Sequence, residues 1–140
     1  MIQLILGNKG KGKTKVLLDK ANTEIKTAHG SIVYLDKSAK HMYELNNKVR
    51  LIDISGFALN SSDEFTGFIY GVLSQDHDLE QMYLDSFLTI AKVETPAEAN
   101  ALLDKLGEIG EKFQVSFIIS ISLEADDIDP KFKENIIAEL

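Results

Sequence analysis

The residues best suited to chemistry lie in the segment GNKGKGKT, from Gly7 to Thr14. Gly7, Gly12, Lys13 and Thr14 fit the pattern G-x-x-x-x-G-K-[ST] without a mismatch, a pattern typical of loops that bind nucleotide phosphates. The glycines let successive backbone N–H groups point at phosphate oxygens. Lys13 would reach the β- and γ-phosphates, and the Thr14 hydroxyl would bind Mg²⁺.

This segment carries more positive charge than the pattern requires. Four lysines alternate between Lys9 and Lys15, in a chain whose formal net charge is −7. Such a cluster in an acidic protein favours a bound anion, and the alternative is a solvated basic turn. The residues expected to contact the nucleotide are Gly7, Asn8, Lys9, Gly10, Lys11, Gly12, Lys13, Thr14 and Lys15.

Composition limits the class of protein. A chain of 140 residues, 44% hydrophobic and 26% charged, predicts a single folded domain over residues 1–140. The pI near 4.9 argues against a general nucleic-acid partner. No cysteine is present, which fits a reducing cytoplasm. No apolar run approaches the ~20 residues of a membrane span, so no membrane partner is expected.

Short apolar runs alternate with amphipathic segments along the chain, which predicts a parallel sheet with helices on both faces. Strands are expected at residues 2–6, 31–36, 49–55, 81–87 and 114–122, of which the last is the most apolar and reads as a central strand. Helices are expected at residues 13–27, at 38–45 with Met42 and Leu45 inward, after the cap SSDE at 61–64, at 95–112, and from 129 to the C-terminus.

Residues 1–27 resemble the Walker A region of P-loop nucleoside triphosphatases, which implies a three-layer P-loop fold binding a nucleoside triphosphate and Mg²⁺. The segment YLDS, ending at Ser86, is similar to the Walker B segment of the RecA-like branch. That resemblance implies that Asp85 completes the Mg²⁺ site. It also implies a five-stranded sheet of order 3-2-4-1-5, with the Asp85 strand beside the loop strand. The chain further resembles small bacterial ATP-binding proteins labelled as twitching-motility proteins by similarity to pilus retraction ATPases.

A second aspartate is an alternative metal ligand. Asp53 belongs to DISG, a D-x-x-G string that resembles the switch motif of GTPases. That branch also needs an N-K-x-D motif to read guanine, and no such string follows a later strand. ATP is therefore the expected nucleotide, and Asp85 is preferred to Asp53.

Catalytic groups are less evident than binding groups. The resemblance implies a water-activating carboxylate just after the second strand, where Asp36 could serve or could merely cap a turn. Arg50 is the only arginine and begins a strand, so we expect it to be structural rather than an arginine finger. Ser120 could sense the γ-phosphate or fill space under a helix.

These observations predict an ATP-binding protein with weak or partner-dependent hydrolysis. The alternative is a nucleotide-sensing regulatory module without significant hydrolysis. A homo-oligomer or a protein partner could supply the groups that the chain lacks.

Overall fold

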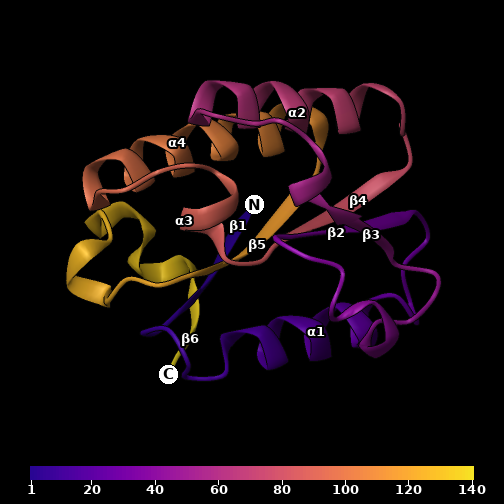
Figure 1. Ribbon diagram of the computed structural model, residues 1–140, viewed down its shortest axis with the longest axis horizontal. Coiled ribbons are helices and arrows are strands. Elements are labelled where there is room, and N and C mark those ends of the chain that lie inside the picture. Colours follow the sequence, from indigo (N-terminus) through magenta and orange to yellow (C-terminus); the bar gives the residue numbers. More distant parts are fainter.

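A computed structural model describes residues 1–140 and shows a six-stranded sheet between two layers of helices (Figure 1). The strands are β1 (Ile2–Leu6), β2 (Ser31–Asp36), β3 (Arg50–Asp53), β4 (Leu79–Leu84), β5 (Ser116–Ile121) and β6 (Ile136–Glu139). Their order across the sheet is β3-β2-β4-β5-β1-β6, and every neighbouring pair is parallel. The carboxyl ends of all six strands therefore lie along one edge.

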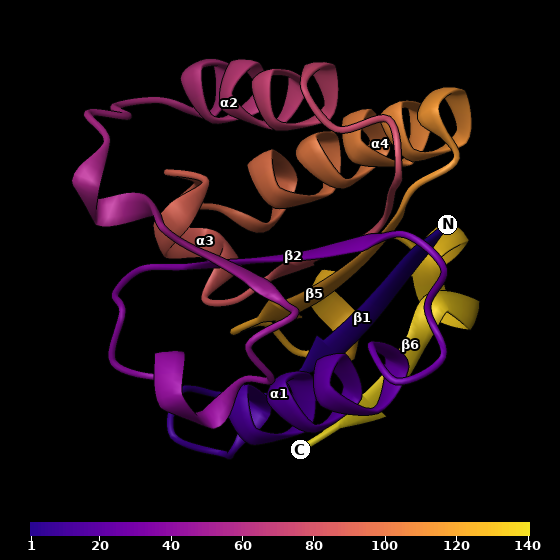
Figure 2. The ribbon, with the colours of Figure 1, turned by 90° about the vertical axis from the view of Figure 1, so that its right-hand side faces the viewer.

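The helices divide unequally between the two faces of the sheet. They are α1 (Lys13–Glu24), α2 (Ser62–Ser74), α3 (Phe87–Ile90) and α4 (Pro96–Phe113), with 3-10 turns at Met42–Glu44, Ile54–Gly56, Ala125–Asp127 and Pro130–Asn135. Helix α1 covers one face, and α2, α3 and α4 cover the other (Figure 2). No helix combines the length and apolarity that a membrane crossing requires.

Local capping signals explain where two of the helices begin. The Ser61 hydroxyl accepts a hydrogen bond of 3.1 Å from the backbone N–H of Glu64, at the start of α2. The Thr95 hydroxyl accepts one of 3.2 Å from the N–H of Glu98, at the start of α4. Both starts were expected from sequence, because these side chains satisfy N–H groups that the first turn leaves free.

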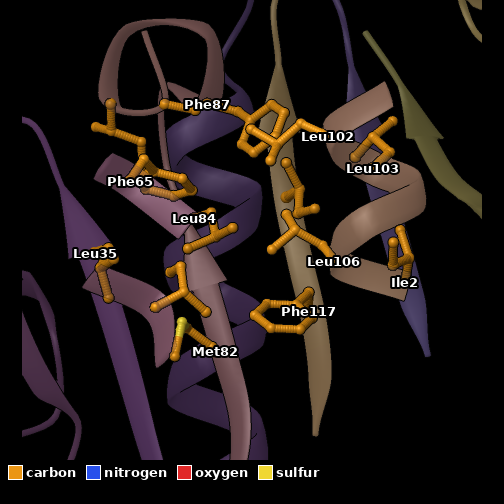
Figure 3. Close-up of a cluster of buried hydrophobic side chains, with 14 of the residues drawn as sticks. Ile2, Leu35, Phe65, Met82, Leu84, Phe87, Leu102, Leu103, Leu106 and Phe117 are labelled. Carbon is orange, nitrogen blue, oxygen red and sulfur yellow. The ribbon is translucent and has the colours of Figure 1, made fainter. Parts of the chain in front are cut away.

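The core has two parts because strand side chains alternate between the faces of the sheet. The larger part holds 28 buried residues under α2, α3 and α4, and Figure 3 shows Phe65, Phe87 and Phe117 among them. The smaller part holds 10 residues under α1, including Tyr34 and Tyr83. The core on the α1 face of the sheet is thus the smaller of the two, and the candidate site lies at the edge of that face.

The expected strand order 3-2-4-1-5 is wrong. Strand β5 lies between β4 and β1, so the strand that precedes Asp85 does not neighbour the strand that precedes the loop. The apolar composition of β5 accounts for its place, since an internal strand of a covered parallel sheet is buried on both faces. The expectation that residues 114–122 form a central strand is confirmed.

The expected C-terminal helix is also wrong. After a 3-10 turn at Pro130–Asn135, the chain forms strand β6 and pairs with the outer edge of β1. The N–H of Leu140 continues this pairing with a hydrogen bond of 2.9 Å to the carbonyl of Leu6. This pairing satisfies backbone groups on the edge of β1 that would otherwise lack partners.

The expected helix at residues 38–45 is reduced to a single 3-10 turn. Leu45 is buried as expected, but Met42 is 48% exposed. The turn ends at Glu44 and Leu45 has an extended backbone, so Met42 and Leu45 do not share one helical face.

Candidate functional site

The segment between β1 and α1 curls tightly through three glycines. Gly7, Gly10 and Gly12 have φ values of 149°, 87° and 94°, a region that glycine enters at little cost. Gly12 is the N-cap of α1, and no side chain caps the helix there. The first N–H groups of α1 are therefore free for another acceptor, at the end of the helix where an anion is favoured.

Lys13 turns inward in the first turn of α1. Its side chain is buried, and its ammonium donates a hydrogen bond of 3.1 Å to the carbonyl of Asn8 within the same loop. Burial lowers the pKa of Lys13, and the negative charge of Asp85 partly offsets this effect. A buried cation held against its own loop is suited to an anionic ligand.

The other lysines of the segment lie differently. Lys9 and Lys11 are exposed on the loop. Lys15 points to the outer surface of α1, where it pairs with Asp19 at 3.3 Å, and both side chains are largely exposed. Of the four lysines, only Lys13 is enclosed.

Asp85 follows β4 and is the most highly connected side chain at this edge. It is 2% exposed and accepts three hydrogen bonds from hydroxyl groups. Thr14 Oγ1 donates at 3.3 Å and Ser120 Oγ at 2.7 Å, both to Oδ1, and Tyr34 OH donates at 2.7 Å to Oδ2. The carboxylate therefore reaches the start of α1, although β5 separates the two strands.

Asp36, at the end of β2, is a second buried carboxylate with fewer partners. It is 2% exposed, and its Oδ1 accepts a hydrogen bond of 2.7 Å from the N–H of Lys37. Its Oδ2 is buried and has no partner. Burial raises the pKa of Asp36, the charge of Asp85 raises it further, and the Lys37 N–H and His41 oppose the shift.

Ser120, on β5, links this strand to Asp85 and Ser86 at the end of β4. Its hydroxyl donates to Asp85 and accepts a hydrogen bond of 3.0 Å from the N–H of Ser86, and the side chain is buried. Ser122, two residues further on, is exposed. The hydroxyl of Ser120 is thus part of the Asp85 cluster rather than a filler of apolar space.

Sequence reasoning missed Tyr34. This residue lies two positions before Asp36 on β2, so both side chains lie on the α1 face. Its ring stacks on Tyr83 with a centroid separation of 6.0 Å, and its hydroxyl ends at Asp85. A tyrosine in an apolar strand predicts only core packing, and its alternation with Asp36 is the one signal that places it here.

The alternative candidates lie elsewhere. Asp53, on edge strand β3, accepts hydrogen bonds from the N–H and the hydroxyl of Ser55, and so caps a 3-10 turn. The exposed Arg50 side chain pairs at 3.4 Å with the largely buried carboxylate of Asp76. Neither contacts the loop or Asp85, which agrees with the expectation that Arg50 is structural.

The structure offers a partial ligand set for a metal ion. No group of three or more His, Cys, Asp or Glu side chains could hold one. Thr14 and Asp85 together present a hydroxyl oxygen and a carboxylate beside the loop. This set fits Mg²⁺, which keeps several waters and is bound through one or two carboxylates plus substrate phosphates.

A cavity of about 370 Å³ opens beside the loop. Its walls come from Leu6–Asn8, from Leu123–Asp126 after β5, and from Glu139 and Leu140. The volume lies within the range of about 300–1,000 Å³ that small-molecule sites occupy. The cavity borders the loop only at Gly7 and Asn8, and its lining does not include Lys13, Thr14 or Asp85.

No protein-family model matches this chain, and no curated protein gives a significant sequence match.

Proposed function

We propose that this protein binds Mg²⁺ with a nucleoside triphosphate, ATP in preference to GTP, at the loop of residues 7–14, in the manner of a P-loop protein. One observation carries the proposal. The buried Lys13 ammonium, the Thr14 hydroxyl and the Asp85 carboxylate meet at the uncapped N-terminus of α1. The Lys13 ammonium can bind phosphate oxygens, and the Thr14 hydroxyl and the Asp85 carboxylate can bind Mg²⁺.

Each part of the loop has its own role in the proposal. The free N–H groups of the loop and of α1 would bind phosphate oxygens. Lys13 would exchange the Asn8 carbonyl for the β- and γ-phosphates, since a charged acceptor makes a stronger hydrogen bond than a neutral one. Thr14 can offer an oxygen lone pair to the metal while its hydroxyl still donates its hydrogen bond to Asp85.

Hydrolysis would depend on Asp36. Bound Mg²⁺ would neutralise charge on the phosphates. The unpartnered Oδ2 of Asp36 would accept a proton from the water that attacks the γ-phosphorus, as the nucleoside diphosphate leaves. A raised pKa makes Asp36 a better proton acceptor than an ordinary aspartate near neutral pH. No arginine lies at the site, so we expect slow turnover by the isolated chain.

A second candidate function is nucleotide sensing without turnover. Two features favour it. The residue directly after Asp85 is Ser86, which cannot act as a general base, and Arg50 pairs with Asp76 away from the candidate site. A second subunit or a protein partner could supply the missing arginine. The RecA-like assignment is also part of the proposal and rests on the sequence resemblance alone. The strand order expected from that resemblance is not the one observed.

Isothermal titration calorimetry with ATP and GTP, each with Mg²⁺ or with EDTA, tests the proposal. We expect metal-dependent ATP binding that Asp85→Ala abolishes and Asp53→Ala leaves intact. The proposal is overturned by absence of binding of both nucleotides, or by the reverse order of the two variants. Phosphate release, measured for the natural chain and for Asp36→Asn at several protein concentrations, separates an ATPase from a sensor.

A further inference from the structure

The geometry points to Tyr34 as a positioning residue that sets the affinity of the site for a divalent metal ion by fixing Asp85. The inference rests on the proposed function and adds to it a residue that no nucleotide-binding pattern includes. Tyr34 is fully buried, and its hydroxyl donates a hydrogen bond of 2.7 Å to Asp85 Oδ2.

The two carboxylate oxygens of Asp85 have separate sets of partners. Oδ1 receives the hydroxyls of Thr14 and Ser120, and Oδ2 receives only Tyr34. Because each oxygen has its own donor, the plane of the carboxylate is fixed. Oδ1 therefore faces Thr14, which is the arrangement that aligns the two metal-binding groups.

The loss of the Tyr34 hydroxyl would leave Oδ2 buried without a partner. A buried carboxylate oxygen without a donor is costly, so the group would turn to share the remaining donors. Oδ1 would then turn away from Thr14, or Oδ2 would compete with Oδ1 for the Ser120 hydroxyl. Groups that orient metal ligands in this way typically change metal affinity by about 10–100-fold when they are removed.

The ring of Tyr34 has a separate, structural role. It stacks on Tyr83 with an angle of 10° between the rings and belongs to the core under α1. Tyr34→Phe keeps this ring and removes only the hydroxyl. Tyr83→Phe is the matched control, because Tyr83 is equally buried in the same stack and its hydroxyl donates to Gln81 at 2.7 Å, away from Asp85.

The test uses the full chain and Mn²⁺ as a probe for the divalent ion. Electron paramagnetic resonance gives the Mn²⁺ affinity of the protein with a non-hydrolysable ATP analogue, and calorimetry in EDTA gives the affinity for the analogue alone. We expect Tyr34→Phe to lower the Mn²⁺ affinity by about 10–100-fold and to leave the metal-free affinity unchanged. Tyr83→Phe should alter neither.

Three results would overturn the inference: an unchanged Mn²⁺ affinity in Tyr34→Phe, an equal loss in both affinities, or an equal loss in Tyr83→Phe. Each leaves the proposed function intact, provided that the natural chain binds the analogue. If the natural chain binds no nucleotide with or without Mn²⁺, both the proposed function and the role of Tyr34 are wrong.

Discussion

The ammonium of Lys13 and the carbonyl oxygen of Asn8 are 3.1 Å apart and form a hydrogen bond across the loop that contains them both. The loop thus supplies a neutral acceptor for its own buried cation. A phosphate oxygen at the same place would add the attraction between opposite charges, which a neutral carbonyl cannot supply. Exchange of one acceptor for the other is the step that we expect nucleotide binding to require.

The first prediction concerns the charge on Lys13. Lys13→Met keeps the apolar part of the side chain and removes the ammonium. A hydrogen bond to a charged group contributes about 1.5–3 kcal/mol, so the affinity for Mg-ATP should fall by roughly 10–100-fold in calorimetry. Lys11→Met, on the exposed part of the same loop, is the control and should cause a smaller loss. A larger loss in Lys11→Met would show that Lys13 is not the principal cation.

The second prediction concerns Gly7, whose φ of 149° is combined with close packing. A Cβ at this position would lie 2.9 Å from the carbonyl oxygen of Leu140. Gly7→Ala should therefore lower the free energy of unfolding by about 1–3 kcal/mol in urea denaturation. Gly56→Ala, where nothing lies within 4 Å, should change it by no more than about 0.5 kcal/mol. Equal effects of the two substitutions would contradict this account.

The third prediction is a dependence of stability on pH that arises from Asp36. Its pKa is raised in the folded chain, chiefly by burial and then by Asp85, above the value of about 3.9 in an unfolded chain. Between those two values the folded state binds more protons, so its stability falls as the pH rises, and the penalty is complete above the raised pKa. Asp36→Asn removes this penalty.

Urea denaturation across about pH 4 to 8 measures the effect. The variant should be more stable than the natural chain at neutral pH, and the difference should shrink toward pH 4. A difference that stays constant across this range would mean that the Asp36 carboxyl is not perturbed by its surroundings.

The fourth prediction concerns Arg50. Its side chain is 61% exposed, but it pairs with an Asp76 side chain that is only 7% exposed, so Arg50→Ala should cost about 1–3 kcal/mol of stability by leaving that carboxylate without its cation. Phosphate release per subunit should be unchanged, because the guanidinium makes no contact at the candidate site. A loss of turnover that increases with protein concentration would instead assign Arg50 to the site of a neighbouring subunit.

Much of the local structure could be predicted from sequence. Strands at residues 2–6 and 31–36 and the helix starts after Ser61 and Thr95 are confirmed with the expected bounds. These features depend on nearby residues alone: apolar runs that end at polar residues, and side chains that cap the first turn of a helix.

The strand order and the last strand could not be predicted in the same way. The place of β5 depends on competition among strands for the centre of the sheet, and the pairing of Ile136–Glu139 depends on the open edge of β1. Both are decided by partners far along the chain. A short segment such as IIAE has no period long enough to separate strand from helix.

The candidate site was predictable in its groups and not in its connections. Loop residues 7–14, Asp85 and Ser120 meet at the carboxyl edge of the sheet, where strand ends in a parallel sheet converge. Asp36 ends the strand next to that of Asp85 at the same edge. The bond from Tyr34 was not foreseen, because it depends on the neighbouring register of β2 and β4.

The pairing of β1 has a consequence for the synthesis of this protein. Of the six strands, β1 is synthesised first, and it pairs only with β5 and β6, which are synthesised last among the six. Until residues 116–139 are made, β1 exposes an apolar strand with both edges open, and folds dominated by such distant pairings form slowly. A nascent chain that stops before residue 116 would hold the complete loop of residues 7–14 without the strands that anchor it, so nucleotide affinity should appear late in synthesis.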